Sequence, residues 1–268
     1  MKKNLSYIEN LVRHSDYDRF MLSMFLPATV RADVWAVLAF NHEIAKTREV
    51  VSESTLGHIR LQWWRESIAE IYEGKKIKEH EVIQPLAEAI IRHDLPRELF
   101  DNLIYAREFD LEDVLPASIE GLFNYIDFTT MPLMKLIIQI SGGGEADFAD
   151  ISNVALHYGV SGLMRATYVL AKQRRFYLPE DLIKQHQIDL DDIFEHSSAL
   201  PQVVQAVFEA RPELVKPKHV FLRGSVALSD VYFKQLRALN YDVMSSKARI
   251  DPVFKVLRLF WKTKGLSF

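Results

Sequence analysis

The sequence has 268 residues, of which 49% are hydrophobic and 26% charged, and its formal net charge is −3. These values are typical of a folded globular protein and exclude an intrinsically disordered one. A net charge this close to zero gives no support to a nucleic-acid-binding function. Because the sequence has no cysteine, disulfides, thiolate metal sites and cysteine catalysis are excluded.

Helical periodicity runs through the whole sequence, and no segment shows the alternation of a strand. The sequence therefore predicts an all-α protein, with helices at residues 4–13, 16–25, 29–51, 56–73, 82–93, 96–109, 119–141, 147–172, 179–184, 201–211, 229–239 and 252–263. Three glycines at 142–144 form a hinge between two long helices. Because apolar helices continue on both sides of it, we expect one domain spanning residues 1–268.

No targeting or membrane-spanning segment is expected. Residues 1–7 lack the apolar core of a signal peptide and the Arg/Ser-rich character of a transit peptide. The longest apolar stretch, residues 131–140, is about half of the ~20 residues that a membrane span needs. It also contains Pro132, Lys135 and Gln139. We expect a cytoplasmic protein.

Two of the long predicted helices carry a distinct stripe along one face. The stripe of helix 29–51 ends with Ala45, followed one turn later by Glu49. The stripe of helix 147–172 is small and apolar and consists of Gly159, Gly162, Ala166 and Leu170. A stripe of this second kind permits close helix approach or lines a dry pocket.

Several short motifs follow one another in a fixed order. They are Leu26-Pro27-Ala28, Ala39-Phe40-Asn41, Glu43-Ile44-Ala45, Val51-Ser52-Glu53, Arg60-Leu61-Gln62-Trp63-Trp64-Arg65, Ala106-Arg107-Glu108, Tyr125 with Thr129, and Arg175 with Tyr177-Leu178-Pro179. Over residues 17–242 this order resembles the squalene/phytoene synthase family, which joins two prenyl diphosphates head to head. It is most similar to a divergent branch that includes a mitochondrial assembly factor of respiratory complex I and alphaproteobacterial relatives. The resemblance implies an isoprenoid-synthase-type helical bundle around a central cavity.

The resemblance also shows what this chain lacks. In that family each of two helices carries an Asp-x-x-x-Asp pair that holds Mg²⁺ against the diphosphate. The matching positions here are Ala45 and Glu49 on one helix, and Ala166 and Leu170 on the other, so three of the four carboxylates are missing. Since Mg²⁺ requires oxygen ligands, we expect a catalytically degenerate member. The branch implies an assembly or chaperone-type factor, with a complex I subunit or assembly intermediate as its partner.

Two other functions stay open. A prenyltransferase of the same fold could use an altered acidic set, Glu43, Glu49 and Glu53, and would then need Mg²⁺; otherwise no cofactor is expected. Alternatively, the small apolar residues that replace the aspartates suit the neutral tail of an isoprenoid lipid or quinone held in the cavity.

No catalytic residue and no metal ligand is assigned. The candidate ligand-binding residues of the relic cavity are His42, Ala45, Glu49, Arg165, Ala166, Leu170, Arg175 and Tyr177. His42 stands where the family commonly has an arginine that touches diphosphate, or it is a surface residue beside the cavity. Arg165 binds an anionic headgroup or forms a structural ion pair. Arg175 and Tyr177 contact a ligand or brace the end of a helix.

Two further motifs have structural interpretations. Adjacent residues cannot share one helix face, so one of Trp63 and Trp64 is predicted in the core and the other at a rim, where an arginine could cover its ring. The aspartate clusters at 110–113 and 189–192 are predicted to be helix caps and solvated surface instead of metal sites.

The last predicted helix is amphipathic. Its apolar residues Val253, Leu257, Phe260 and Trp261 recur at helical spacing, with Lys255, Arg258 and Lys262 on the other side and Lys264 beyond. A basic amphipathic helix with aromatic residues is typical of a membrane interface, so residues 252–264 are a candidate contact with the inner membrane (its matrix side in mitochondrial relatives). The alternative is a last helix packed on the bundle, with lysines extending to water.

Overall fold

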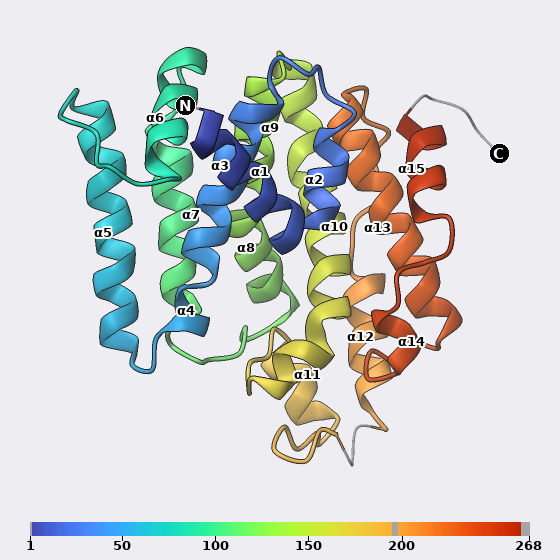
Figure 1. Ribbon diagram of the computed structural model, residues 1–268. Helices are drawn as coiled ribbons and strands as arrows, with labels where there is room; N and C mark the ends of the chain where they lie inside the picture. The colour runs from blue at the N-terminus through green and yellow to red at the C-terminus, as the bar shows by residue number, and fades with distance from the viewer. Residues whose placement is uncertain (1, 195–197, 264–268) are drawn as a thin grey trace. The chain divides into compact units, whose positions relative to one another are not determined.

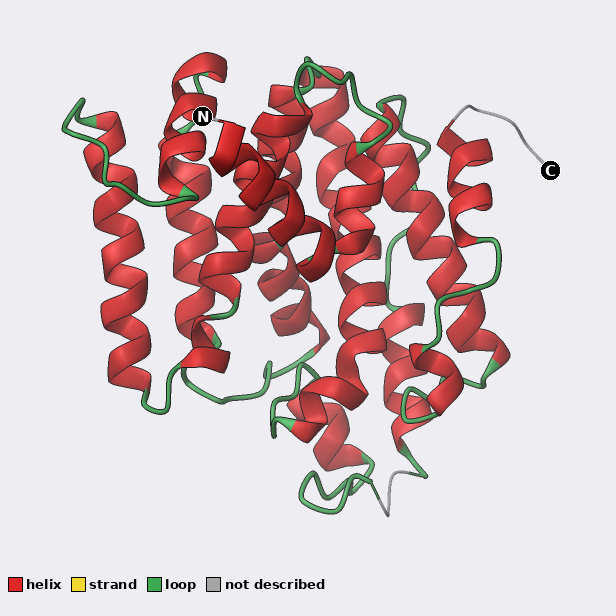
Figure 2. Ribbon diagram, in the orientation of Figure 1, coloured by secondary structure: helices red, strands yellow, loops and turns green. Residues whose placement is uncertain are grey.

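The computed structural model describes residues 2–194 and 198–263, and within them the regular elements are all α-helices (Figures 1 and 2). In chain order they are α1 (Lys2–Ser15), α2 (Tyr17–Ser23), α3 (Arg31–Ala45), α4 (Thr47–Val50), α5 (Ser54–Tyr72), α6 (Ile83–His93), α7 (Arg97–Phe109), α8 (Ile119–Thr129), α9 (Met131–Ile140), α10 (Glu145–Lys172), α11 (Glu180–Gln185), α12 (Leu200–Glu209), α13 (Val220–Ala238), α14 (Ser246–Arg249) and α15 (Lys255–Thr263). The all-α prediction is confirmed. None of these described helices combines the length and the apolarity that crossing a bilayer requires.

The chain divides into two compact units. The first comprises residues 1–112, 128–151 and 219–221, and the second comprises residues 113–127, 152–218 and 222–268. Helix α10 begins in the first unit and continues into the second. That residues 1–268 form a single domain stays a prediction.

Helix α3 forms the middle of the first unit, where it packs against α1, α6 and α9. Its residues from Ala36 to Asn41 are all buried, as expected for a helix enclosed on every side. At its centre, the ring of Phe40 meets Trp64 of α5 and Phe100 of α7 edge-on, at centroid distances of 5.6 and 5.5 Å. Edge-to-face pairs add about 0.5–1.5 kcal/mol each to the burial of the rings, so this aromatic cluster joins three helices.

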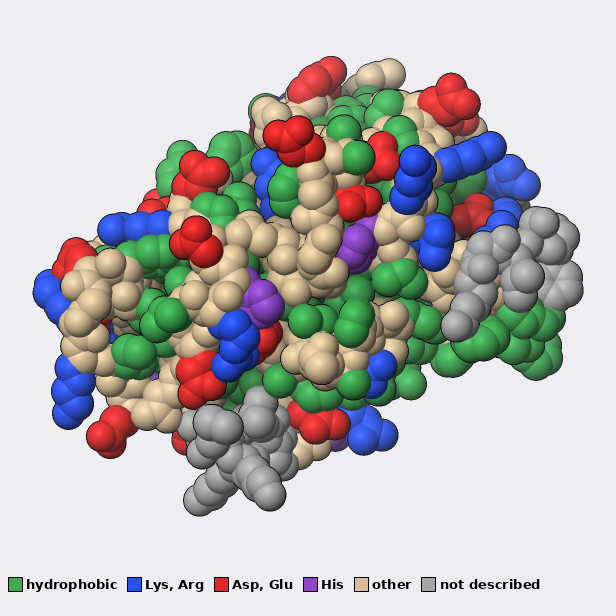
Figure 3. Space-filling view, turned by 90° about the horizontal axis from the view of Figure 1, so that it is seen from above, with side chains coloured by type: hydrophobic (Ala, Val, Ile, Leu, Met, Phe, Trp, Pro, Cys, Tyr) green, Lys and Arg blue, Asp and Glu red, His purple; other side chains and the backbone are tan. Residues whose placement is uncertain are grey.

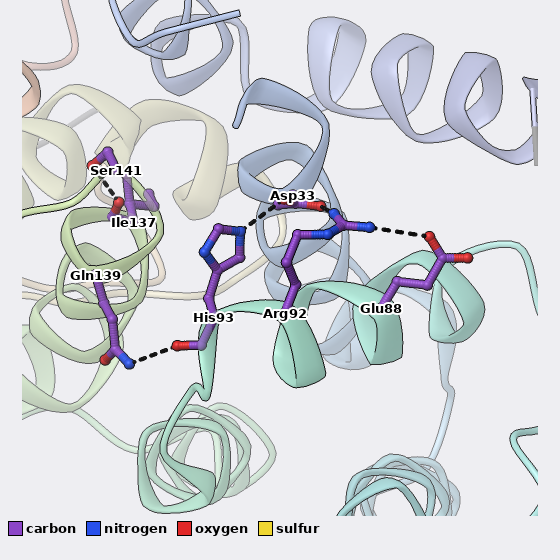
Figure 4. A network of polar contacts seen from close by, with 7 residues as sticks. All are labelled: Asp33, Glu88, Arg92, His93, Ile137, Gln139 and Ser141. Carbon is purple, nitrogen blue, oxygen red and sulfur yellow. Dashed lines mark hydrogen bonds and ion pairs between the residues drawn. The ribbon is translucent and has the colours of Figure 1, made fainter. Parts of the chain in front are cut away.

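A buried carboxylate on α3 anchors the end of α6 (Figure 4). Asp33, 5% exposed, accepts hydrogen bonds from Arg92 at 2.5 Å and from Nε2 of His93 at 2.8 Å. Gln139 of α9 donates to the carbonyl oxygens of His93 and Asp94, at 3.0 and 2.9 Å. These bonds satisfy carbonyl groups that a helix end leaves without partners, and they connect α3, α6 and α9 through polar contacts.

In the second unit, hydroxyl groups connect α10 and α13. The Oγ atoms of Ser161 and Ser229 lie 2.9 Å apart, and Ser229 also donates to the carbonyl oxygen of His157 at 2.7 Å. All three side chains are less than 9% exposed. Because buried hydroxyls are costly without partners, this closed chain of bonds favours one register between the two helices.

Some predicted boundaries differ from the observed ones. The predicted helix 29–51 ends at Ala45, and a turn at Lys46 separates it from α4. The predicted helix 119–141 is divided at Thr130, just before Pro132, which occupies the first turn of α9. Helix α13 begins at Val220, nine residues earlier than predicted, and α14 was not predicted. The hinge at 142–144 does separate α9 from α10.

Candidate functional site

The first group of candidate residues lies at the end of α3 and on α4. His42 and Ala45, both half-buried, occupy the last turn of α3, whereas Glu49 is exposed on α4. Burial, and secondarily Lys46, lowers the pKa of His42 below its ordinary value. This shift favours the neutral imidazole, so His42 is a weaker source of positive charge for a diphosphate than the arginine that the resemblance places here.

The buried carboxylate beside these residues is already neutralised. Glu43, 5% exposed, accepts a hydrogen bond from Nζ of Lys46 at 2.5 Å and from the guanidinium of Arg60 at 2.8 Å. Each of its oxygens thus has one cationic partner. A divalent ion at this carboxylate would have to displace these cations or lie beside them, so Glu43 is a poor metal ligand.

Glu49 and Glu53, two members of the acidic set that the prenyltransferase alternative needs, are four residues apart but do not lie on one helix. Between them the backbone of Val51 is extended, with φ −116° and ψ 145°. Glu53, which is exposed, precedes the first residue of α5 instead of continuing α4. To share an ion, the two carboxylates would have to lie at successive turns of one helix. The extended residue between them prevents this arrangement.

The second group lies on and after α10. Arg165, whose side chain is 16% exposed, stacks on the ring of Tyr232 at 3.6 Å and lies 3.4 Å from a carboxylate oxygen of Asp251. Ala166 and Leu170 are half-buried on the same helix. The geometry of Arg165 is that of the structural ion pair, reinforced by a cation–π contact. Its predicted role toward an anionic headgroup stays a prediction.

Arg175 and Tyr177 lie just beyond the end of α10. The amide of Arg175 bonds to the carbonyl oxygen of Leu170 at 3.0 Å, across Arg174 in the left-handed conformation (φ 55°), and this is the pattern of a helix C-cap. The guanidinium of Arg175 donates to the hydroxyl of Tyr177 at 2.8 Å. The ring of Tyr177 lies 4.8 Å from that of Tyr125. These contacts match the bracing alternative.

The residues at the family's metal positions do not fit Mg²⁺. Ala45, Ala166 and Leu170 offer no side-chain oxygen, and Mg²⁺ requires near-octahedral oxygen coordination. Within residues 2–194 and 198–263, no three His, Asp or Glu side chains form a group suited to holding a metal ion. The two groups of candidate residues belong to different compact units, so their meeting across one cavity stays a prediction.

The arginines of the Arg60–Arg65 motif form contacts that sequence reasoning missed. Arg60 bonds to Glu43 of α3, and Arg65 bonds to Glu108 of α7 at 2.7 Å. Both carboxylates belong to motifs that carry the family resemblance. The motif therefore joins α5 by charge to α7, which lies beside it in Figure 1, and to the end of α3. The partners lie 17 and 43 residues away, and no local spacing reveals them.

The prediction for the two tryptophans is confirmed. Trp64 is 1% exposed and Trp63 is 36% exposed. The cation near the outer ring is a lysine and not an arginine, because Nζ of Lys78 lies 5.3 Å from the centre of the Trp63 ring.

The prediction of a solvated surface for Asp110 is wrong. This carboxylate is 5% exposed and lies 3.2 Å from the guanidinium of Arg107, one turn earlier on the chain. In the second cluster, by contrast, the exposed Asp189 accepts a hydrogen bond from the amide of Asp191 at 2.9 Å, as in a polar turn.

The helical arrangement is that of an isoprenoid synthase. A dehydrosqualene synthase whose crystal structure contains a ligand matches 98% of this chain and 96% of its own, with a TM-score of 0.74 and 12% sequence identity. The chain belongs to the squalene/phytoene synthase family, whose family model matches residues 12–253.

Relatives with two kinds of name are found. NADH dehydrogenase (ubiquinone) complex I, assembly factor 6, from Bos taurus is 30% identical over 253 residues, which cover 88% of this chain and 75% of the bovine protein. Phytoene synthase from Thermus thermophilus is 25% identical over 177 residues, covering 65% of this chain and 58% of the enzyme.

Proposed function

We propose that this protein is a non-catalytic member of the squalene/phytoene synthase family that assists the assembly of respiratory complex I. The observation that carries the proposal is its similarity, over 88% of its length, to a protein named as a complex I assembly factor. The local chemistry supports it, because the positions that would hold Mg²⁺ carry Ala45, Ala166 and Leu170.

The prenyltransferase alternative is weaker for a reason visible in the first unit. It needs Glu43, Glu49 and Glu53 to act as one acidic set. Glu43 is engaged by Lys46 and Arg60, and an extended residue separates Glu49 from Glu53. Departure of a diphosphate needs concentrated positive charge on the leaving group, and this acidic set is poorly arranged to hold the ions that supply it.

We further propose that α15 rests on an anionic membrane surface. The apolar side chains Val253, Phe254, Val256, Leu257 and Phe260 are between 43% and 71% exposed. Hydrophobic side chains gather at the right-hand edge of Figure 3, on the side of α15. The neighbouring cations Arg258 and Lys262 are exposed as well. An exposed apolar strip flanked by cations complements a bilayer that carries negative charge.

The basic face of this helix differs from the predicted one. Lys255 is 5% exposed: its Nζ lies 2.6 Å from Asp251 and 3.3 Å from the hydroxyl of Tyr232. It holds α15 to the second unit and is not available to lipid. Lys264 lies outside the described residues. The proposed membrane contact therefore depends on fewer cations and on more exposed apolar surface than the sequence indicated.

The assembly function is tested in the native host. The tagged protein should recover complex I subunits from detergent-treated membranes, in excess over a tag-only control. In a deletion strain, restored complex I activity should be the same with the wild type and with Glu49→Ala, which removes the last carboxylate at a family metal position. Loss of rescue by Glu49→Ala, with normal protein level, would contradict the non-catalytic role.

A further inference from the structure

A small basic pocket lies in the second unit, apart from the candidate site. It has a volume of about 330 Å³ and is formed by the segment 214–217, by α13 and by the end of α15. Its lining includes three cations, Lys216, Arg223 and Lys262, and one carboxylate, Asp230. Pockets that bind small molecules begin at about this size.

The positive charge of the pocket is not balanced from within. Asp230 is engaged by Lys234, at 2.8 Å. Neither Lys216 nor Lys262 forms an ion pair with any part of the described chain. Three cations that converge on one hollow repel each other, so the arrangement favours a bound anion.

Arg223 is the third cation of the pocket, and its guanidinium is held in place. Its terminal nitrogen donates to the carbonyl oxygen of Thr263 at 2.7 Å, which fixes the guanidinium in place. Its Nε atom is buried and has no hydrogen-bond partner in the described chain. The guanidinium that lines the pocket is thus fixed by one backbone hydrogen bond and has no carboxylate partner among the ion pairs of the described chain.

The segment 214–217, which forms one wall of the pocket, is held in position by α10. The side chain of Asn153 donates to the carbonyl oxygen of Glu213 at 2.9 Å and accepts from the amide of Val215 at 3.1 Å. Nε2 of His157 donates to the carbonyl oxygen of Pro212 at 3.0 Å. An irregular segment fixed by three hydrogen bonds loses little further freedom when a ligand binds, so this wall of the pocket is preorganised.

The rest of the lining is apolar and includes Leu214, Val226 and Ala227. A ligand that complements both the cationic and the apolar side chains of the pocket carries a phosphate and an adjoining hydrocarbon segment. Lys262 also belongs to α15, whose apolar side chains are exposed. We propose that this pocket binds the phosphate of an anionic phospholipid, with the glycerol and first acyl carbons against the apolar wall. The proposal rests on the membrane contact of α15 for the source of the lipid.

The test uses lipid that is not assembled into a membrane. The full-length protein is titrated by calorimetry with dihexanoyl phosphatidylglycerol below its micelle-forming concentration. Parallel titrations use dihexanoyl phosphatidylcholine and glycerol phosphate. The variant Lys216→Ala/Lys262→Ala removes two pocket cations, and Lys76→Ala/Lys184→Ala removes two exposed lysines elsewhere. Equal melting temperatures confirm that all proteins are folded.

Saturable binding of phosphatidylglycerol is expected, weakened about tenfold or more by the pocket variant, because charge-assisted hydrogen bonds to phosphate are the strong ones. The control variant should stay within about twofold of the wild type, as exposed charges far from a site contribute little. Equal binding of phosphatidylcholine, or an unchanged affinity of the pocket variant, would overturn the proposal. Glycerol phosphate binding as tightly as the lipid would assign the pocket to a soluble phosphate ester and overturn the lipid assignment. Monomeric lipid requires neither a bilayer nor complex I, so failure here is separate from failure of the proposed function.

Discussion

The buried carboxylate of Glu43 lies 2.8 Å from the guanidinium of Arg60, 17 residues further along the chain. The ammonium group of Lys46 donates a hydrogen bond to the other carboxylate oxygen of Glu43 at 2.5 Å. Glu43, two residues before Ala45, is therefore an internal ion-pair partner that connects α3 to α5. In the sequence, Glu43 belongs to the acidic set of the prenyltransferase alternative. In the structure, its carboxylate contributes to the packing of the first unit instead.

The first prediction concerns the stability that Glu43 supplies. Replacing Glu43 by Gln leaves two cations next to a neutral group, so we expect the free energy of unfolding to fall by about 1–3 kcal/mol. The partners Lys46 and Arg60 are about 30% exposed, and this exposure keeps the value below that of a fully buried pair. The exposed Glu49→Gln should cost less than about 1 kcal/mol. Urea unfolding measures both, and equal effects of the two variants would refute this role of Glu43.

The second prediction concerns metal and diphosphate. Since Ala45, Ala166 and Leu170 provide no ligand oxygen, a non-hydrolysable farnesyl diphosphate analogue should show no tight binding that depends strictly on Mg²⁺. Calorimetric titrations with Mg²⁺ and with a chelator should give the same result. Tight binding that disappears with the chelator would restore the enzyme alternative.

The third prediction concerns the membrane contact of α15. The protein should co-sediment with phosphatidylglycerol vesicles at low salt and less so as salt rises, because the attraction of cations to an anionic surface is screened. Phe254→Ser/Leu257→Ser should reduce the bound fraction severalfold, since two exposed apolar side chains no longer insert. The control Ile59→Ser/Ile91→Ser changes side chains that are 63% and 68% exposed in the first unit.

Point variants are preferable to removing the helix in this experiment. Truncation after Arg249 would also delete Asp251, Lys255 and the fully buried Leu259, all of which belong to the packed second unit. Vesicle binding that the α15 variant leaves unchanged, or that the control variant lowers equally, would show that this helix has no special role at the membrane.

The fourth prediction is a dependence of stability on pH through His157. Burial, and secondarily Arg211, lowers the pKa of this side chain below its ordinary value of 6.5. Below about pH 6.5 the imidazole of His157 is therefore protonated in the unfolded chain but still neutral in the folded protein. The free energy of unfolding falls as the pH drops from there toward the folded-state pKa. His157→Gln keeps a donor for Pro212 but does not titrate. Urea midpoints at pH 7.5 and 5.5 should differ less for this variant, and an equal difference would contradict the prediction.

The helices were predictable to the extent that periodicity and punctuation mark them. Gly74, with φ 66°, lies just beyond the predicted helix end at residue 73, and Pro96 directly precedes α7. The end of α3 at Ala45 has no Pro or Gly to signal it. The early start of α13 was missed because Gly224 and Ser225 interrupt its apolar pattern, although both are buried in the structure.

The buried side of α15 and the choice between the two alternatives for Arg165 could not be predicted, for a common reason. Lys255 is buried because Tyr232 and Asp251 receive it, and Arg165 is held by the same two residues. Helical spacing assigns residues to faces, but it does not identify what packs on each face. Partners 23, 67 and 86 residues away in the sequence decide which cation is enclosed.

Gly162 offers a direct experimental use of the fold. A methyl group at this position of α10 would meet no atom within 4 Å, and the residue is exposed. Glycine inside a helix is less favourable than most residues by about 0.5–1 kcal/mol, so a substitution there should not weaken the helix. Because the chain has no cysteine, Gly162→Cys would give the protein its one thiol, on the helix whose neighbouring turn carries Arg165 and Ala166. A photoreactive label at that thiol would covalently capture whatever molecule approaches this part of α10 in the cell.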